Sequence, residues 1–270
     1  MTSHAPTVGD LLRDWRKRRR LSQLDLASDA EISPRHLSFV ETGRAQPSRE
    51  MILHLAEQLE VPVRERNLLL VAAGFAPMFP ERPLGDPALE AARKAVTLVI
   101  EAQRPFPAFA VDRHWTVIAS NAALPELYVG CSAELLAQPI NALRLSLHPE
   151  GMAPRIRNLP EWRAHLLAVL RKQVDVTADP VLIELHRELA GYPLSGGRRA
   201  DPAPPDPEGV VVPLQVATEA GVLSFFSTTT LFGTPVDVTL SEIAIESLFP
   251  ADAATAALVR RLEEKRAKVG

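Results

Sequence analysis

Short stretches of apolar residues at helical spacing, separated by capping residues and tight joints, fill the first 75 residues of the sequence. Ser22 and Ser33 stand where helix N-caps are expected, and Pro34 follows at a first helical position, where its missing N–H costs nothing. Gly43 and Gly74 stand where a helix C-terminus favours glycine. The pattern therefore predicts an all-α region of five helices, which begin near Val8, Gln23, Ser33, Pro47 and Val63.

The hydrophobic pattern changes after a proline-rich segment. Residues 75–87 contain four prolines and are typical of a linker, and a helical pattern follows over 88–103. Beyond it, apolar and polar residues alternate, as they do in half-buried strands. The alternation predicts strands over 106–111, 115–120, 210–217 and 221–230 and a further strand within 236–249, with helices over 122–128, 134–138, 161–174, 180–189 and 251–268.

These elements predict an α+β protein of two domains. A five-helix domain at residues 1–76 is followed by a linker and connecting helix at 77–103 and by an α/β domain with an antiparallel sheet at 104–270. The proline-rich segment 196–209 is expected to be a surface loop within the second domain, because the strands after it need partners.

Charge and cysteine content exclude several classes of protein. The 30 Lys and Arg residues against 33 Asp and Glu residues give a net charge of −3, which argues against a general polyanion binder. The basic run Arg16–Arg20 can still hold phosphates. The single cysteine, Cys131, excludes an internal disulfide and a cysteine-based zinc site. No stretch suits a membrane span or a secretory signal, so a cytoplasmic protein is expected.

The second and third predicted helices have the arrangement of a helix-turn-helix, whose later helix enters the major groove of DNA. The helical spacing turns Leu24 and Ala27 of the earlier helix toward the core. On the later helix, Arg35 can pair bidentately with O6 and N7 of guanine. Phe39 can contact a thymine methyl group or pack on the DNA backbone, and Arg44 is a candidate for a phosphate or minor-groove contact.

The segments LSQLDLA, ISPRHLSFVETGRAQPS and LHLAEQLEV, within residues 12–63, resemble the lambda-repressor-like (Xre/Cro) helix-turn-helix family. The resemblance implies that Gln23 contacts a phosphate from a helix N-terminus. It also implies that Arg16 pairs with Glu41. Both partners of that pair are present in this sequence.

The base-contacting positions of that family fall on Pro34, Arg35 and Phe39, with His36 and Ser38 nearby. Proline and phenylalanine cannot donate hydrogen bonds to bases, so base recognition must depend on Arg35, on His36 or on DNA shape. The candidate DNA contacts are therefore Gln23, Ser33, Pro34, Arg35, His36, Ser38, Phe39 and Arg44.

Residues 88–268 contain no catalytic motif. The sequence has no G-x-x-x-x-G-K-[ST] phosphate loop, no G-x-G-x-x-G and no H-E-x-x-H. Ser195 lacks the first glycine of a nucleophile elbow. The histidines at 114, 148, 165 and 186 are scattered, so surface or capping roles explain them better than a metal site. We therefore expect that the protein is not an enzyme and that it has no catalytic residue and no metal site.

Three further blocks of sequence resemble the ligand-binding domain of MmyB-like transcription regulators. They are PAFAVDRHWTVIASNAAL, then LRLSLHPEGM with RIRNLPEWRAHLLAVLRKQ, and finally VVPLQVATEAGVLSFFSTTTLFGTPVDVTLSEIAIESLFPADAAT. The resemblance implies a PAS-like α/β fold. It also implies a small apolar ligand, such as a fatty acid. We expect no cofactor apart from such a ligand.

Large aromatic side chains on the predicted strands of this region could enclose a small apolar cavity. The pattern makes Phe106, Phe109, Trp115, Phe225 and Phe226 the candidate ligand contacts. The alternative for each of these side chains is a place in an ordinary hydrophobic core.

Together these features predict a cytoplasmic, ligand-responsive, sequence-specific DNA-binding transcription regulator. Its partners would be a double-stranded operator, a small apolar molecule and a second copy of the chain, because two half-sites multiply a limited affinity. The ligand would shift an equilibrium between two arrangements, with the segment 75–103 as the coupling element. One alternative is a second domain that only dimerises or docks a protein. Another is a catalytic second domain, against which the missing motifs weigh.

Overall fold

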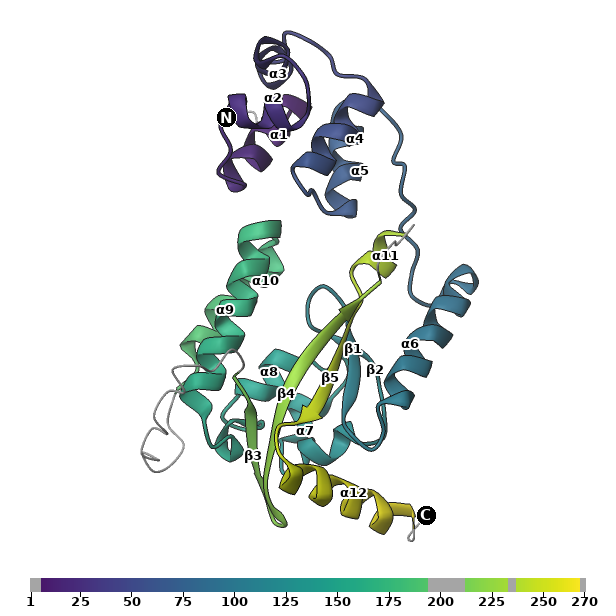
Figure 1. The fold of residues 1–270 in the computed structure, drawn as a ribbon, viewed down its shortest axis with the longest axis vertical. Coiled ribbons are helices and arrows are strands. Elements are labelled where there is room, and N and C mark those ends of the chain that lie inside the picture. The colour runs from purple at the N-terminus through teal and green to yellow at the C-terminus, as the bar shows by residue number, and fades with distance from the viewer. Residues whose placement is uncertain (1–5, 194–211, 233–236, 268–270) are drawn as a thin grey trace. The chain divides into compact units, whose positions relative to one another are not determined.

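The computed structural model describes residues 6–193, 212–232 and 237–267, and the predicted surface loop at 196–209 lies outside this described part. The chain divides into two compact units (Figure 1). The helical unit comprises residues 1–83, 175–177 and 234–241, and the sheet unit comprises residues 84–174, 178–233 and 242–270. The sheet unit therefore includes the helix that the sequence assigns to a connecting segment.

Most of the helical unit is built from the first five helices of the chain, as the sequence predicts. The N-cap residues Thr7, Ser22, Ser33 and Ser48 each accept a hydrogen bond from a backbone amide in the first helical turn. Gly43 adopts a φ of +71°, the left-handed conformation that ends a helix. The helices are α1 (Val8–Arg18), α2 (Gln23–Asp29), α3 (Pro34–Glu41), α4 (Arg49–Gln58) and α5 (Val63–Ala72), and the same unit contains α11 (Val238–Ser241).

The core of the helical unit departs from the expected pattern at α2. Leu24 is 66% exposed, so the expectation that it faces the core is wrong. The expectation for Ala27 is confirmed, and Leu26 is buried beside it in place of Leu24. The reason is that α2 has only 7 residues, so its packing on α3 and α4 decides which side turns inward. Leu37 and Val40 of α3 are buried as well, which leaves the opposite side of α3 toward solvent.

The sheet unit contains, in the described part of the chain, an antiparallel sheet of five strands in the order β2-β1-β5-β4-β3. β1 and β5, which are far apart in sequence, pair at its centre, with Ala110 opposite Ile245. β3 and β4, which correspond to the strands predicted over 210–217 and 221–230, form a hairpin. The strands are β1 (Ala108–Val111), β2 (Val117–Ser120), β3 (Leu214–Thr218), β4 (Gly221–Leu231) and β5 (Ala244–Pro250).

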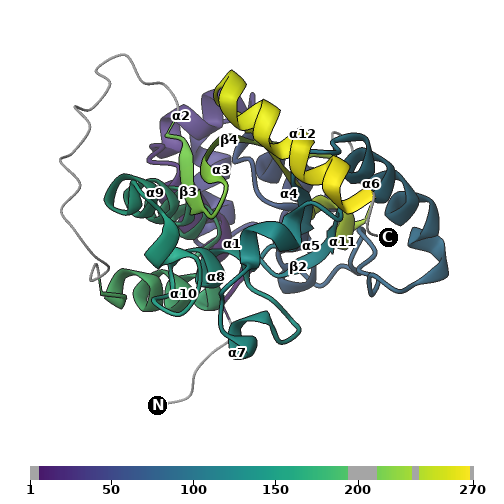
Figure 2. The same cartoon turned by 90° about the horizontal axis from the view of Figure 1, so that it is seen from below.

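Helices lie on both faces of this sheet. α8, α9 and α10 lie on one side and α6 on the other (Figures 1 and 2), and α6 contacts β1, β2 and β5. The helix expected over 122–128 is the short 3-10 helix η2, and α8 has no counterpart in the sequence-based prediction. The helices are η1 (Pro87–Leu89), α6 (Glu90–Ala102), η2 (Leu124–Tyr128), α7 (Ala133–Leu136), α8 (Ala142–Leu147), η3 (Ala153–Arg155), α9 (Leu159–Thr177), α10 (Pro180–Gly191) and α12 (Ala253–Ala267).

Side chains alternate between the two faces of the sheet, as the pleat requires. Phe109 of β1 and Thr229 of β4 both lie directly opposite Glu246 of β5, so the three share one face, and that face lies toward α8 and α9. Phe226 and Phe249 point to the other face, where their ring centroids stack 5.4 Å apart. The register of β5 therefore decides which side chains meet the helices.

Candidate functional site

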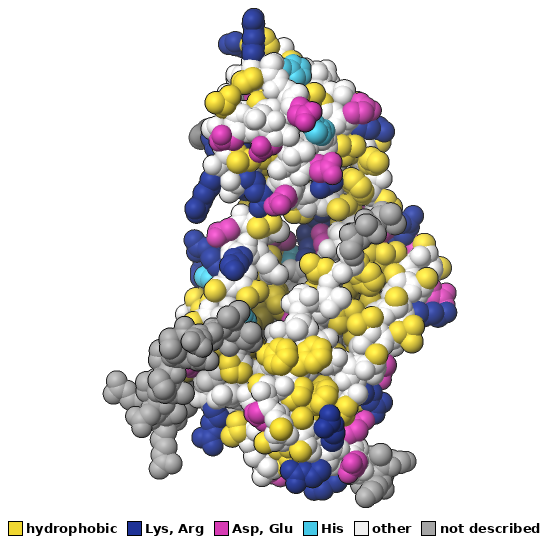
Figure 3. Space-filling view, viewed as in Figure 1, with side chains coloured by type: hydrophobic (Ala, Val, Ile, Leu, Met, Phe, Trp, Pro, Cys, Tyr) yellow, Lys and Arg dark blue, Asp and Glu magenta, His cyan; other side chains and the backbone are white. Residues whose placement is uncertain are grey.

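The outer side of α3 carries most of the side chains that the sequence assigns to DNA contact. Ser33 caps α3, because its hydroxyl oxygen accepts a hydrogen bond from the amide of His36 at 3.1 Å. Pro34 and Arg35 are exposed, and His36 and Ser38 are half-buried. Figure 3 shows Lys or Arg side chains at the end of the helical unit where α3 lies.

Phe39 contacts two arginines at this surface. The guanidinium carbon Cζ lies 5.3 Å from the centroid of the Phe39 ring in Arg35 and 5.9 Å from it in Arg44. Guanidinium groups are attracted to aromatic rings at this distance. Phe39 thus restrains both arginines, which lowers the side-chain entropy that they would lose on contacting a partner.

Glu41, the last residue of α3, anchors this helix in the unit. Its side chain is buried, and Nε and Nη2 of Arg16 donate to its two carboxylate oxygens at 2.7 and 2.8 Å. Nε2 of Gln23 donates to the same carboxylate at 2.8 Å, and the Arg13 guanidinium donates to the Glu41 carbonyl oxygen. The Arg16–Glu41 pair implied by the resemblance is therefore present.

Burial alone would raise the pKa of Glu41. The hydrogen bonds from Arg16 and Gln23 outweigh burial and hold the pKa of Glu41 below its ordinary value. Hydrogen bonding to Glu41 in turn raises the pKa of Arg16. The pair is thus fully ionised near pH 7 and links α1 to the end of α3.

Gly9 sets the distance between α1 and α3, a role that the sequence analysis missed. A Cβ atom at this position would lie 2.5 Å from the carbonyl oxygen of Val40 and 2.8 Å from that of Glu41. Both are backbone atoms, so a side chain at residue 9 would push α1 away from α3. The available signal was a glycine inside a helical pattern, whose cost calls for a packing reason.

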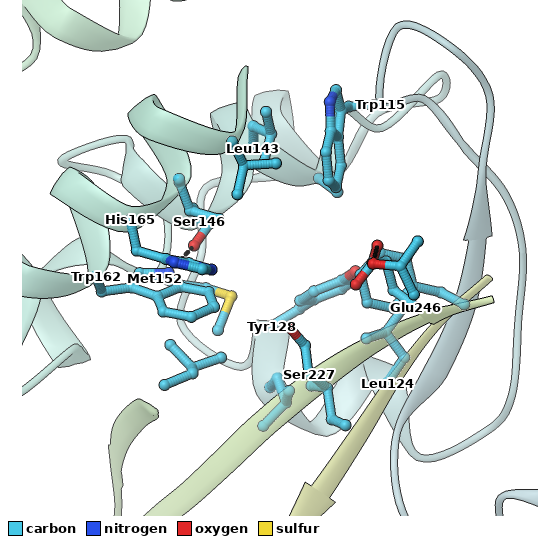
Figure 4. Close-up of a pocket in the computed structure, with 18 residues that line it drawn as sticks. Trp115, Leu124, Tyr128, Leu143, Ser146, Met152, Trp162, His165, Ser227 and Glu246 are labelled. Carbon is cyan, nitrogen blue, oxygen red and sulfur yellow. Dashed lines mark hydrogen bonds between the residues drawn. The ribbon is translucent and has the colours of Figure 1, made fainter. Parts of the chain in front are cut away.

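In the sheet unit, a cavity of about 120 Å³ lies between the sheet and the helices η2, α8 and α9. Figure 4 shows Trp162 and His165 on one side of it and Tyr128 and Glu246 on the other. An engineered cavity of about 150 Å³ holds benzene in another protein, so the space suits a compact group of about six carbon atoms. Its polar lining consists of Ser146, His165, Ser227, Thr229 and Glu246, together with the phenol of Tyr128.

The five candidate ligand contacts divide into two groups. Phe109 lines the cavity from β1, and Trp115 lines it from the β1–β2 turn, where its φ is +66°. Phe106 packs against the edge of the core, Phe225 is fully buried within the core, and Phe226 lies on the other face of the sheet. None of these last three lines the cavity formed by the described residues.

The indole groups of the cavity have partners within the protein. Nε1 of Trp162 donates to the hydroxyl oxygen of Ser146 at 3.0 Å, and Nε1 of Trp115 donates to Oε1 of Gln173 at 2.7 Å. Burial lowers the pKa of His165, with a smaller contribution from the positive charge of Lys172. The His165 imidazole is therefore neutral near pH 7.

Glu246 is the acidic side chain of the cavity, and the sequence analysis missed it. The residue is 7% exposed, and Oγ1 of Thr229 donates to its Oε1 at 2.7 Å. Burial raises the pKa of Glu246, although the hydrogen bond from Thr229 opposes the shift. A glutamate within the apolar stretch AIESLF was the available signal, because acidic side chains are rarely buried without a partner.

Within the described residues, no group of three or more His, Cys, Asp or Glu side chains could hold a metal ion. In the same residues, no helix combines the length and the apolar character needed to cross a membrane.

Two family matches coincide with the two halves of this description. Residues 7–69 match a helix-turn-helix domain, and residues 92–262 match the MmyB-like transcription regulator ligand binding domain. A helix-turn-helix joined to a regulator's ligand-binding domain defines a DNA-binding transcription regulator. Because the second match covers more than half of the chain, the chain belongs to the MmyB-like transcription regulator family. No curated protein matches it.

The similarity of this chain to solved structures is weaker than its similarity to the two family models. The clp gene regulator ClgR from Corynebacterium glutamicum is 28% identical over 36% of this chain and 90% of its own, with a TM-score of 0.22. An RNA-binding light-oxygen-voltage receptor is 13% identical over 97% of this chain and 64% of its own, with a TM-score of 0.27. Neither score is high enough to add to the assignment.

Proposed function

We propose that this transcription regulator is ligand-responsive: a small apolar molecule bound in the cavity of the sheet unit changes the affinity of the helical unit for a specific operator. The observation that carries the proposal is a mostly apolar cavity inside the ligand-binding domain of a regulator. The proposal includes no catalytic step. We further propose that the protein acts in the cytoplasm, where its operator lies, and that it binds two half-sites as a homodimer.

The proposed DNA interface is the outer side of α3 with its flanking residues. Arg35 would bind a guanine in the major groove, restrained by Phe39, and Arg44 would bind a phosphate. Gln23 would contact a phosphate with an N–H of its amide besides the one donated to Glu41. Ser33, Pro34, His36 and Ser38 would complete the contact surface beside these residues.

Replacing Arg35 with alanine is expected to weaken operator binding by about 1–3 kcal/mol and to relax specificity at one base pair. The operator would be selected from random DNA, and affinities measured by fluorescence anisotropy at fixed salt. Arg187→Ala is the matched control, because it removes the same charge from an exposed position on α10. An equal loss on operator and random DNA would reduce Arg35 to a phosphate contact.

The connection between β4 and β5 supplies a route from the cavity to the helical unit. Ser227 and Thr229 of β4 and Glu246 of β5 line the cavity. The described part of the chain between these strands includes α11, which belongs to the helical unit and contacts α5. We therefore add the β4–β5 connection to the segment 75–103 as the proposed coupling element.

Three polar contacts hold α11 to the segment that follows α5. Nη1 of Arg82 donates to Oδ2 of Asp237 at 2.9 Å, and the Asp237 side chain is 1% exposed. Oγ1 of Thr239 donates to the Arg82 carbonyl oxygen at 2.6 Å, and the amide of Val238 donates to the Pro80 carbonyl oxygen at 2.9 Å. A shift of β4 or β5 would therefore be transmitted to the polypeptide next to α5.

The variant Asp237→Asn should bind the small molecule normally. In this variant, however, the small molecule should change operator affinity much less than in the wild type. In allosteric proteins such a change is commonly about 5–150-fold. Native mass spectrometry would identify the molecule that co-purifies with the protein, and operator affinity would be compared before and after its removal. Glu81→Gln, which breaks the exposed Arg64–Glu81 pair, is the control. If ligand leaves wild-type operator affinity unchanged, the sheet unit serves only dimerisation or protein docking.

A further inference from the structure

Glu246 occupies the centre of the sheet face that forms one wall of the cavity. It lies on β5, with Phe109 of β1 and Thr229 of β4 as its direct cross-strand neighbours. Oγ1 of Thr229 donates one hydrogen bond to the carboxyl group at 2.7 Å. A carboxylate has about four acceptor positions, so this bond leaves most of the acceptor capacity of Glu246 for another donor.

The described side chains around the cavity provide no cation to balance this carboxyl group. Among the described residues that line it, none is Lys or Arg, and the imidazole of His165 is neutral near pH 7. A buried carboxylate without a positive partner is costly, and burial accordingly raises the pKa of Glu246. The cavity is therefore electrostatically complementary to a positive charge.

The remaining walls suit the same kind of group. Among the described residues, Phe109, Trp115, Tyr128 and Trp162 line the cavity with their aromatic rings. Aromatic faces attract organic cations, and the attraction is strongest where water is excluded. The cavity volume of about 120 Å³ limits the enclosed part of the ligand to a compact group.

We propose that the ligand carries a compact organic ammonium group, which forms an ion pair with the carboxylate of Glu246 and contacts the surrounding aromatic rings. The inference rests on the proposed sensor function and specifies its ligand class. A fatty acid fits less well, because its carboxylate would meet Glu246 with no Lys or Arg among the described cavity residues. A neutral alcohol would gain a hydrogen bond but no charge pairing.

Three probes with the same six-carbon chain test the proposal: hexylammonium, hexan-1-ol and hexanoate. Isothermal titration calorimetry on the full-length protein at pH 7 should show hexylammonium binding at least about tenfold more tightly than hexan-1-ol. Hexanoate should bind most weakly. Fluorescence provides a second signal, because Trp115 and Trp162 both line the cavity.

The variant Glu246→Gln separates charge pairing from shape. Glutamine keeps the size of the side chain and an oxygen that can accept the hydrogen bond from Thr229, so hexan-1-ol should bind the variant and the wild type equally. The preference for hexylammonium should disappear. Glu134→Gln, which removes a charge from an exposed position on α7 outside the cavity, should leave all three affinities unchanged.

Failure of this inference differs from failure of the sensor function. Equal affinities for hexylammonium and hexan-1-ol, no binding of hexylammonium, or tightest binding of hexanoate would each overturn the ammonium proposal. So would a co-purified molecule without an amine that nonetheless changes operator affinity, and that result would support the sensor function. A bound amine that leaves operator affinity unchanged would support the ligand class and contradict the sensor function.

Discussion

Replacing Glu41 with alanine is expected to lower the free energy of unfolding of the helical unit by about 3–5 kcal/mol, the typical cost of removing one partner from a buried ion pair. The carboxylate accepts hydrogen bonds from Arg16 and Gln23, and the Arg16 side chain is only 11% exposed. Without Glu41, the Arg16 guanidinium would be left largely buried with no opposite charge beside it. The end of α3 would also lose its link to α1.

Hydrogen exchange measured by mass spectrometry on the full chain would report this loss for α1–α5 separately from the sheet unit. Glu57→Ala is the matched control, since Glu57 is an exposed residue of α4 and its loss should cost little. A cost below about 1 kcal/mol for Glu41→Ala would mean that the Arg16–Glu41 pair stabilises the fold no more than a solvent-exposed ion pair does.

The same pair sets the response of the helical unit to acid. The pKa of Glu41 is lower in the folded protein than in an unfolded chain, so its stabilisation is complete above the unfolded pKa. It is lost as pH falls through the lower, folded pKa. The wild type should therefore lose more stability than Glu41→Ala on acidification below about pH 4.

Replacing Phe225 with alanine is expected to destabilise the sheet unit by about 3–5 kcal/mol, as is usual for a fully buried phenylalanine. Phe225 is 0% exposed and lies opposite Leu214, with which it shares the main core of this unit. It does not line the cavity of the described residues. The substitution should therefore act on folding and leave ligand affinity of the folded fraction largely intact.

The neighbouring residue provides the control for this prediction. Phe226→Ala makes the same change one position along β4, on the other face of the sheet, where the ring is half-buried and stacks on Phe249. Its expected cost is about 1 kcal/mol, the scale of one aromatic pair. Hydrogen exchange of β3 and β4 would compare the two variants, and equal costs would contradict the assignment of Phe225 to the core.

Local signals in the sequence were sufficient to predict the helix-turn-helix. Ser22, Ser33 and Gly43 act within one turn of their own helix, so their effect is visible without tertiary structure. The predicted pair of Arg16 and Glu41 is present for a different reason, because the resemblance carried information about a contact across 25 positions. Leu24 shows the limit of local pattern, since a seven-residue helix has too few turns to define one apolar side.

The sequence by itself determined two things. The first is a helix-turn-helix with Arg35 on the outer side of its later helix, and the second is a domain that combines helices with an antiparallel sheet. It did so because capping and periodicity are properties of neighbouring residues. Only the tertiary structure decided that Phe109 and Glu246 face a cavity while Phe225 fills the core. That outcome depends on the pairing of β1 with β5, more than 130 positions apart, and a shift of one residue in this register would turn Glu246 to the other face.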